Sequence, residues 1–190
     1  MKIIDITKDI LICEPYGNDP KPETDLLQNG DGFRTSCINM CLHTGTHIDA
    51  PLHCLENGKE INKLYLDLFV GECTVKAFFE NVMTGEDAEN YLPEGVKRIF
   101  IKGYGKTRLD RSAAYALSAM GVEVVGIDAP TIGTESDDYE VHRQLLLNGI
   151  VIIEGLDLAN VQSGEYKYSA LPLKISGVEA SPCRAVLFKE

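Results

Sequence analysis

What the sequence lacks narrows the classes of protein to which the chain can belong. No apolar run approaches the ~20 residues that a membrane-spanning helix needs, so we expect no segment that crosses a bilayer. The opening stretch MKIIDITKDILIC begins like a secretory signal, but Asp5, Lys8 and Asp9 interrupt its apolar part. The sequence therefore predicts a cytoplasmic protein.

Positive charge is also scarce, because 18 Lys and Arg stand against 29 Asp and Glu and give a formal net charge of −11. Nucleic acids and anionic membrane surfaces both favour basic patches, so we expect neither as a partner. The acidic residues are scattered along the chain, which predicts a solvated acidic surface and not an acidic tail.

The six cysteines form no pattern that predicts a disulfide framework or a zinc ribbon. Cys37 and Cys41 are four residues apart, but no second pair completes a zinc ribbon. A chain of 190 residues without a secretion signal does not need disulfides for its stability. We expect buried or partly buried thiols.

The composition is that of an ordinary globular domain, with 44% hydrophobic and 25% charged residues. The chain is long enough for one sizeable core, and no repeat or long linker divides it, so residues 1–190 are predicted to form a single domain. Residues 13–32 are dense in Pro, Gly, Asn and Asp and predict a long surface loop.

Hydrophobic patterning predicts a mixed α/β fold with more strand than helix. Helices are predicted at 110–121 and 138–149, each with a capping Asp at its start and a Gly at its end. A third helix starts at Thr84 and must stop before Pro93. Strands are predicted at 2–7, 33–42, 73–79, 98–103, 122–128, 150–155, 166–173 and 183–188. The two longer helices join the fourth, fifth and sixth of these strands, and such units favour parallel pairing with right-handed crossovers.

Histidine is rare, yet three of the four histidines lie within the eleven residues HTGTHIDAPLH, 43–53. His43 and His47 have the i, i+4 spacing of the helical zinc motif H-E-x-x-H, but the Thr and Gly residues between them are poor helix formers. A strand that enters a glycine-permitted bend fits better. In such an extended segment His47 and Asp49 point to the same side, and a proline turn brings back His53.

Neutral imidazole and carboxylate are the ligands that suit zinc, iron and manganese, so this cluster predicts a metal site. The fourth histidine, His142, lies in the predicted helix 138–149, where an exposed helix histidine is the alternative interpretation. Twelve residues later Glu154 interrupts the apolar strand IVIIEG. A charge at the end of a buried strand is costly unless it is paired or bound to a cation, so Glu154 is predicted to be a ligand or a catalytic group.

The stretch HTGTHIDAPLH resembles the signature H-x-G-T-H-x-D-x-P-x-H of the cyclase family of metal-dependent hydrolases, which includes bacterial kynurenine formamidase and isatin hydrolase. The stretches GIDAPTIG, EGLDLANV and ALPLKISGVEASPCRAVL match the C-terminal half of that family in order and spacing. The resemblance implies a swivelling β/β/α domain with a barrel-like β core and few helices, assembled as a homodimer or a larger homo-oligomer.

The resemblance also implies the roles of individual side chains. The metal ligands would be His43, His47, Asp49, His142 and Glu154. Asp49 would bridge two ions if two are bound, and His53 would lie beside the metal as the general acid/base. Zinc is the expected divalent ion, manganese or iron is compatible with the same residues, and the number of ions is one or two.

The ligand set and the resemblance together predict hydrolysis of a small-molecule substrate. A bound divalent cation can lower the pKa of its water from about 15.7 to about 7, which supplies hydroxide at neutral pH. His53 can then move a proton to the leaving nitrogen. We expect cleavage of the C–N bond of a small amide or formamide, as by an arylformamidase. The alternatives are a lactam or lactone ring, as for isatin hydrolase, and a non-catalytic metal-stabilised binding protein.

Two further side chains bear on the substrate and the chemistry. The sequence has no tryptophan, although formamidases of this type tend to place an N-terminal aromatic residue, often Trp, against an aryl substrate. Tyr16 is the candidate for that role. Cys54 lies next to His53 and suggests a Cys/His nucleophile pair, but neighbours in an extended segment project to opposite faces. The metal-dependent hydrolase is therefore the favoured prediction.

Overall fold

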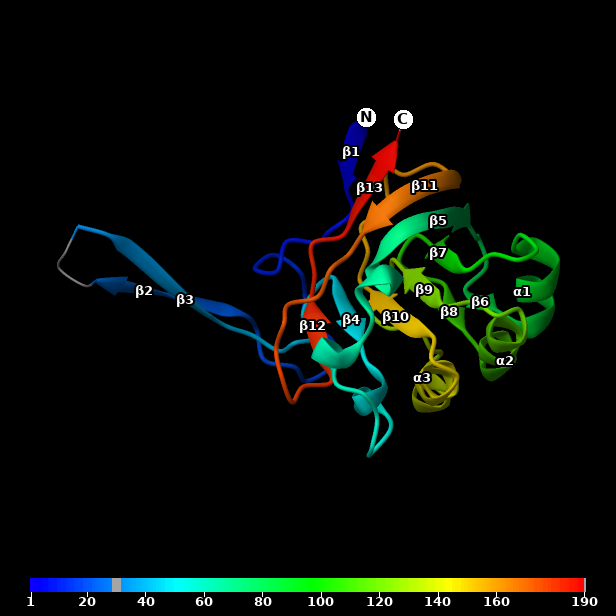
Figure 1. Cartoon of the computed structure of the whole chain (residues 1–190), viewed down its shortest axis with the longest axis horizontal. Helices are drawn as coiled ribbons and strands as arrows, with labels where there is room; N and C mark the ends of the chain where they lie inside the picture. The colour runs from blue at the N-terminus through cyan, green and yellow to red at the C-terminus, as the bar shows by residue number, and fades with distance from the viewer. Residues whose placement is uncertain (29–31, 190) are drawn as a thin grey trace.

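A nine-stranded mixed sheet that curls into half a barrel organises the computed structural model, which describes residues 1–28 and 32–189 (Figure 1). In sheet order its strands are β1 (Lys2–Asp5), β13 (Val186–Lys189), β11 (Gly164–Ser169), β5 (Val70–Ala77), β7 (Arg98–Lys102), β9 (Val124–Ile127), β10 (Val151–Glu154), β4 (His47–Asp49) and β12 (Ala180–Pro182). The predicted strand-rich α/β fold with a barrel-like sheet is confirmed.

The described residues form three α-helices, α1 (Gly85–Tyr91), α2 (Arg111–Ala119) and α3 (Asp138–Leu147), all within the predicted segments. The Thr84 and Asp87 side chains form a capping box at the start of α1, and the Asp110 carboxylate accepts a hydrogen bond from the Ala113 backbone N–H at the start of α2. Short elements complete the chain: 3₁₀ turns η1 (Pro51–His53), η2 (Ile61–Lys63) and η3 (Leu66–Phe69), and the strand pair β6 (Val82–Met83) with β8 (Arg108–Leu109).

The prediction of a capping Asp is wrong at α3. The residue before the helix is Asp137, whose side chain makes no capping hydrogen bond. The Asp138 carboxylate does not cap the helix either: it accepts hydrogen bonds from the Thr131 hydroxyl and the Gly133 backbone N–H, and its Oδ1 lies 3.4 Å from His142 Nδ1. This side chain therefore ties the start of α3 to the loop that follows β9.

The centre of the sheet is parallel, as predicted for the strands that the two longer helices connect. Strand β9 pairs in parallel with both β7 and β10. Side chains alternate along these strands, so Ile99, Val125 and Ile152 pack under the helices. The opposite face holds a second apolar cluster, which fills the inside of the curl and includes Phe100 and Ile153. None of the described helices has both the length and the apolar character needed to cross a membrane.

A hairpin arm, formed by β2 (Glu23–Gln28) and β3 (Arg34–Asn39), projects away from the sheet (Figure 1). The prediction of a loop over 13–32 is therefore wrong for β2, although residues 29–31 lie outside the described part of the chain. The backbone of β2 is paired across its whole length with β3, and the polar composition of β2 conceals this pairing. All six residues of β3 are exposed.

Two smaller expectations also need correction. The strand predicted at 166–173 ends at Ser169, and Pro172, which has no N–H for a sheet ladder, makes only a single bridge with Cys183. All six cysteines are free thiols, but Cys37 is exposed because it lies on the hairpin arm. The expectation of buried or partly buried thiols holds for the other five.

Candidate metal centre

Pairing of β4 with β10 brings the two halves of the predicted ligand set together. The strands are antiparallel, with His47 opposite Glu154 and Asp49 opposite Ile152. Ile152 packs under the helices, so the side chains of His47, Asp49 and Glu154 share the face that α3 covers (Figure 1). Helix α3, which covers this face, supplies His142. His142 is buried, which excludes the alternative of an exposed helix histidine.

The two Asp49 carboxylate oxygens face different imidazoles. Oδ1 lies 3.0 Å from His43 Nδ1 and 3.5 Å from His47 Nε2. Oδ2 lies 3.6 Å from His142 Nε2. Glu154 spans the same two sides, with Oε2 3.4 Å from His47 Nε2 and Oε1 3.0 Å from His142 Nε2. The five predicted ligands therefore form one continuous cluster, in which Asp49 contacts all three histidines.

Unpartnered buried atoms show that these residues fit a cation. Among the described residues, His47 Nε2 and both oxygens of Asp49 are buried and have no hydrogen-bond partner. Orphaned buried polar atoms are costly, and native proteins satisfy nearly all of them. A divalent cation held by imidazole nitrogen and carboxylate oxygen would satisfy all three atoms at once.

Backbone carbonyls hold the outer nitrogens of two of the imidazoles. His47 Nδ1 lies 3.1 Å from the Gly45 carbonyl oxygen, and His142 Nδ1 lies 2.8 Å from the Asp138 carbonyl oxygen. In the neutral tautomer, with Nδ1–H donating outward, each ring would present the Nε2 lone pair to a bound cation. Glu154 is oriented as well, because its Oε1 accepts a hydrogen bond of 2.7 Å from the Ile132 backbone N–H.

The charges of the cluster stabilise one another. Burial favours the neutral imidazole of His47, but the carboxylates of Asp49 and Glu154 outweigh it and raise the pKa of His47 to about 9. Burial opposes ionisation of Glu154, but the hydrogen bond from His142 and the charges of His142 and His47 lower the pKa of Glu154 to about 2. Without a cation the centre therefore carries imidazolium and carboxylate, and a binding metal must displace protons.

His53 lies at the solvent-facing edge of this centre, in the turn η1. Its ring centroid is 4.5 Å from that of His43 and 5.6 Å from that of His142. A ring nitrogen of His53 also lies within 4.8 Å of ligand atoms of His43 and Asp49. Burial, with the charges of His43 and His142, lowers the pKa of His53, while Asp49 opposes the shift. The geometry thus suits a neutral base that exchanges protons with solvent.

A small cavity of about 270 Å³ lies beside His43, and its wall includes Tyr16, for which a substrate contact stays a prediction. The cavity is lined by Lys8, Cys13, Glu14, Tyr16, His43, Gly45, Pro130 and Gly155. Two glycines meet at its wall: a Cβ on Gly155 would lie 2.2 Å from the Gly45 carbonyl oxygen, and Gly155 has a φ of +65°. Only glycine fits there, so this wall is built by close backbone contact.

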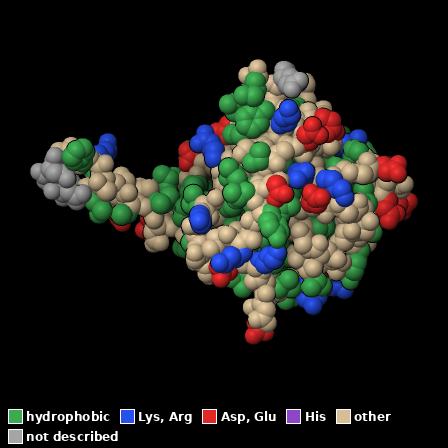
Figure 2. Space-filling view, viewed as in Figure 1, with side chains coloured by type: hydrophobic (Ala, Val, Ile, Leu, Met, Phe, Trp, Pro, Cys, Tyr) green, Lys and Arg blue, Asp and Glu red, His purple; other side chains and the backbone are tan. Residues whose placement is uncertain are grey.

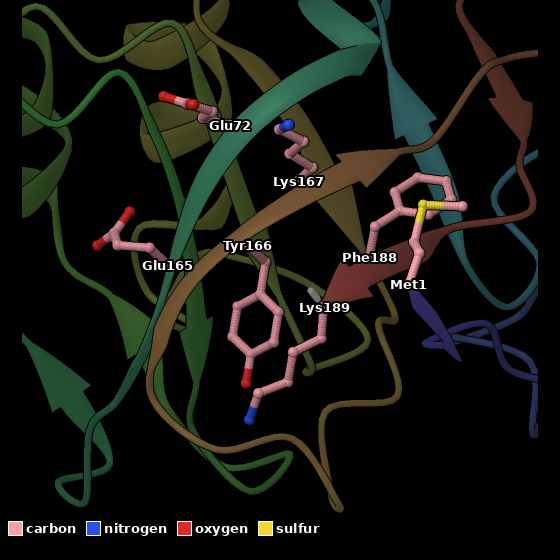
Figure 3. Close-up of a pocket in the computed structure, with 7 residues that line it drawn as sticks. All are labelled: Met1, Glu72, Glu165, Tyr166, Lys167, Phe188 and Lys189. Carbon is pink, nitrogen blue, oxygen red and sulfur yellow. The ribbon is translucent and has the colours of Figure 1, made fainter.

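A larger cavity of about 760 Å³ lies elsewhere, against β5, β11 and β13 (Figure 3). It is lined by Met1, Glu72, Glu165, Tyr166, Lys167, Phe188 and Lys189, whose side chains point in different directions and do not converge. The lining contains no histidine or cysteine. The histidine centre, and not this cavity, is therefore the candidate functional site.

Three polar or titratable residues outside the ligand set, Cys54 among them, have structural surroundings. The thiol of Cys54 packs against the apolar cluster under the helices, and burial raises its pKa, which disfavours the nucleophilic thiolate. Arg184 pairs with Asp5 through two nitrogens and forms a structural ion pair. Asp128 accepts a hydrogen bond from the Gly103 backbone N–H and joins two loops.

One residue near the centre, Glu179, is not predicted from the sequence. Glu179 Oε1 lies 3.3 Å from His43 Nε2, on the side of the ring that faces away from Asp49. In the sequence Glu179 is recognisable only as a charged residue directly before the short buried strand β12. That position does not predict its contact with the loop that carries His43.

Comparisons with known proteins agree with this fold. The cyclase family model matches residues 4–134. A kynurenine formamidase of Bacillus cereus is 34% identical over 162 residues, which cover 79% of this chain and 78% of that protein. A kynurenine formamidase of Salinibacter ruber is 38% identical over 164 residues, covering 79% and 77%.

Solved structures give the same result. One described as a potential metal-dependent hydrolase with cyclase activity superposes with a TM-score of 0.86 at 32% identity and covers 100% of this chain and 98% of that chain. An isatin hydrolase bound to the product analogue thioisatinate has a TM-score of 0.79 at 16% identity, covers 100% and 93%, and shows a shared fold. The histidine–carboxylate centre on a curled mixed sheet is thus that of a metal-dependent hydrolase fold. The chain belongs to the cyclase family.

Proposed function

We propose that this chain is a metal-dependent hydrolase that cleaves the C–N bond of a small amide or formamide. The observation that carries the proposal is the set of buried, unpartnered His47 and Asp49 atoms beside a solvent-facing His53. Kynurenine formamidases among the relatives support an aryl formamide as the substrate. The proposal needs a small-molecule substrate and no nucleic-acid or membrane partner.

The residues divide the work of hydrolysis. A cation held by His43, His47, Asp49, His142 and Glu154 would lower the pKa of a water molecule and polarise the substrate carbonyl. His53 takes a proton from the attacking water and returns it to the nitrogen as the C–N bond breaks, so that acid and amine are the products. The cavity at Tyr16 and His43 holds the organic part of the substrate.

We propose zinc as the ion, with manganese or iron compatible with the same nitrogen and oxygen donors. The separate orientation of the two Asp49 oxygens supports a second ion. The six free thiols support a reducing, cytoplasmic location. Elemental analysis of protein purified without added metal measures both the identity and the number of ions.

The test of the function is turnover of N-formylkynurenine by metal-loaded protein. We expect turnover that a chelator abolishes and added zinc restores, while alkylation of the thiols leaves most of it because Cys54 has no chemical role. Isatin and a simple lactone in the same panel test ring opening. Turnover that survives complete removal of the metal would contradict the proposal, and a metal-loaded protein inert toward the whole panel would leave only a binding role.

We also propose a homodimer, formed through the hairpin arm of β2 and β3. An isolated two-stranded hairpin is marginally stable in water, and this one exposes Leu26, Leu27 and Ile38. Apolar side chains are visible along the arm in Figure 2. Two copies related by a two-fold axis would cover both arms with the same contacts, and this is the commonest symmetry of soluble oligomers.

The arm can be tested by the mass of the protein in solution. The unaltered chain is expected to sediment with twice the chain mass, and the double variant Leu26→Asp with Ile38→Asp is expected to be monomeric. Tyr115→Asp on α2, an equally exposed residue of the body, serves as the matched control and should stay dimeric. A monomeric unaltered protein at micromolar concentration would contradict the dimer.

A further inference from the structure

We propose that Glu179 is a positioning residue of the metal centre, which holds the His43 ring so that Nδ1 presents its lone pair to the cation. The inference rests on the proposed metal site and assigns a role to a residue that is not itself a ligand.

The two nitrogens of His43 face two different carboxylates. Nδ1 lies 3.0 Å from Asp49 Oδ1, and Nε2 lies 3.3 Å from Glu179 Oε1. A neutral imidazole has one N–H, and an ionised carboxylate can only accept. With the hydrogen on Nε2 and donated to Glu179, Nδ1 is left unprotonated toward the centre. A carboxylate behind a ligating histidine fixes both the tautomer and the orientation of the ring.

His43 needs this anchor more than the other two histidines do. His47 and His142 present Nε2 to the centre, and backbone carbonyls of Gly45 and Asp138 hold their Nδ1 atoms. His43 presents the opposite nitrogen and is the most exposed ring of the three, with 19% of its side chain accessible. Its outer nitrogen is held by a side chain, which a substitution can remove.

The sheet delivers Glu179 to this position. The Glu179 carbonyl oxygen accepts a hydrogen bond of 2.8 Å from the Ala50 backbone N–H, and the next residue, Ala180, pairs with Asp49. The backbone is therefore held by β4, independently of the side chain. The Glu179 side chain is 38% accessible. Its removal therefore creates no cavity and leaves no buried polar atom of residue 179 without a partner.

Glu179 acts through His43 and does not bind the cation. Its carboxylate oxygen contacts His43 Nε2, whereas Asp49 contacts Nδ1 on the other side of the ring. Glu179 therefore lies behind the His43 ring and not among the ligands. Its carboxylate adds negative charge behind the His43 ring, which makes Nδ1 a stronger donor.

The experiment measures metal affinity by competition with a chelator for three variants of the full chain, with zinc as the probe. Glu179→Ala is expected to bind zinc about 10- to 100-fold more weakly, the usual effect of losing such an outer partner. Glu179→Gln is expected to lie between, because its amide oxygen accepts the Nε2 hydrogen without the charge. Glu60→Gln is the matched control, since Glu60 holds the Gly177 N–H in the same region but does not touch His43.

Thermal unfolding separates positioning from a structural role. The metal-free Glu179→Ala variant should have the same melting temperature as the metal-free unaltered protein. The rise in melting temperature caused by zinc should be smaller in the variant, because it binds zinc more weakly. Zinc affinity of Glu179→Ala within twofold of the unaltered protein would overturn the inference alone. An unaltered protein that binds no zinc would overturn the proposed function together with it. Should the alanine variant fail to fold, the isosteric glutamine variant decides the same question.

Discussion

Replacing Asp49 by asparagine is expected to abolish both metal binding and turnover. Asp49 is fully buried, and its two oxygens face the rings of His43, His47 and His142. Asparagine keeps the shape but removes the charge and replaces one acceptor with an NH₂ donor. The loss should exceed the ~100-fold that removal of an outer partner causes, because Asp49 lies between the two groups of ligands.

Metal content by elemental analysis and turnover of N-formylkynurenine measure this result together. Asp110→Asn is a suitable control, since Asp110 caps α2 away from the centre and asparagine caps a helix about as well. A variant of Asp49 that retains a full complement of metal and normal turnover would show that the cation, if present, binds elsewhere.

Replacing His53 by alanine is expected to leave the metal content unchanged and to reduce turnover by ~100-fold or more, the usual contribution of a general acid/base. His53 is the most exposed histidine of the centre and lies at its edge, where it can exchange protons with water. The measurement is kcat beside metal content. Asn57→Ala, in the same surface loop, is the matched control.

The pH dependence tests the same residue. Burial, with the charges of His43 and His142, places the pKa of His53 below its ordinary value of 6.5. A base works when it is deprotonated, so turnover should persist at pH 6.5 and fall only as the pH drops through the lowered pKa. The acid limb should be absent from the His53→Ala profile. Loss of a metal ion from that variant would instead identify His53 as a ligand.

Much of the site can be predicted from the spacing of residues along the chain. His47 and Asp49 are two residues apart in an extended segment, so they had to share a face, and β4 confirms this. Glu154 stood out because a carboxylate at the end of an apolar strand needs a partner, and it is 4% exposed beside two imidazoles. These inferences needed only the periodicity of a strand and the cost of burying charge.

Features that depend on which segments or side chains meet could not be predicted. The polar composition of 23–28 gave no sign that this segment pairs with β3, because a hairpin arm exposed on both faces has no hydrophobic alternation. The contact of Glu179 with His43 joins residues 136 positions apart. The carboxylate of Asp138 binds the loop at Thr131 and Gly133 instead of capping its helix. This contact forms because the fold places that loop beside the start of α3.

The sequence by itself determined the chemistry of the donors, the parallel strands joined by helices, and the faces on which His47, Asp49 and Glu154 lie, because these follow from residue type and short-range periodicity. Only the tertiary structure decided that β4 inserts antiparallel between β10 and β12 and that α3 covers the same face. Those contacts bring five side chains from three elements and one loop into one cluster. These strand contacts form because apolar side chains are buried on both faces of the sheet. That burial sets the strand order and register independently of the histidines.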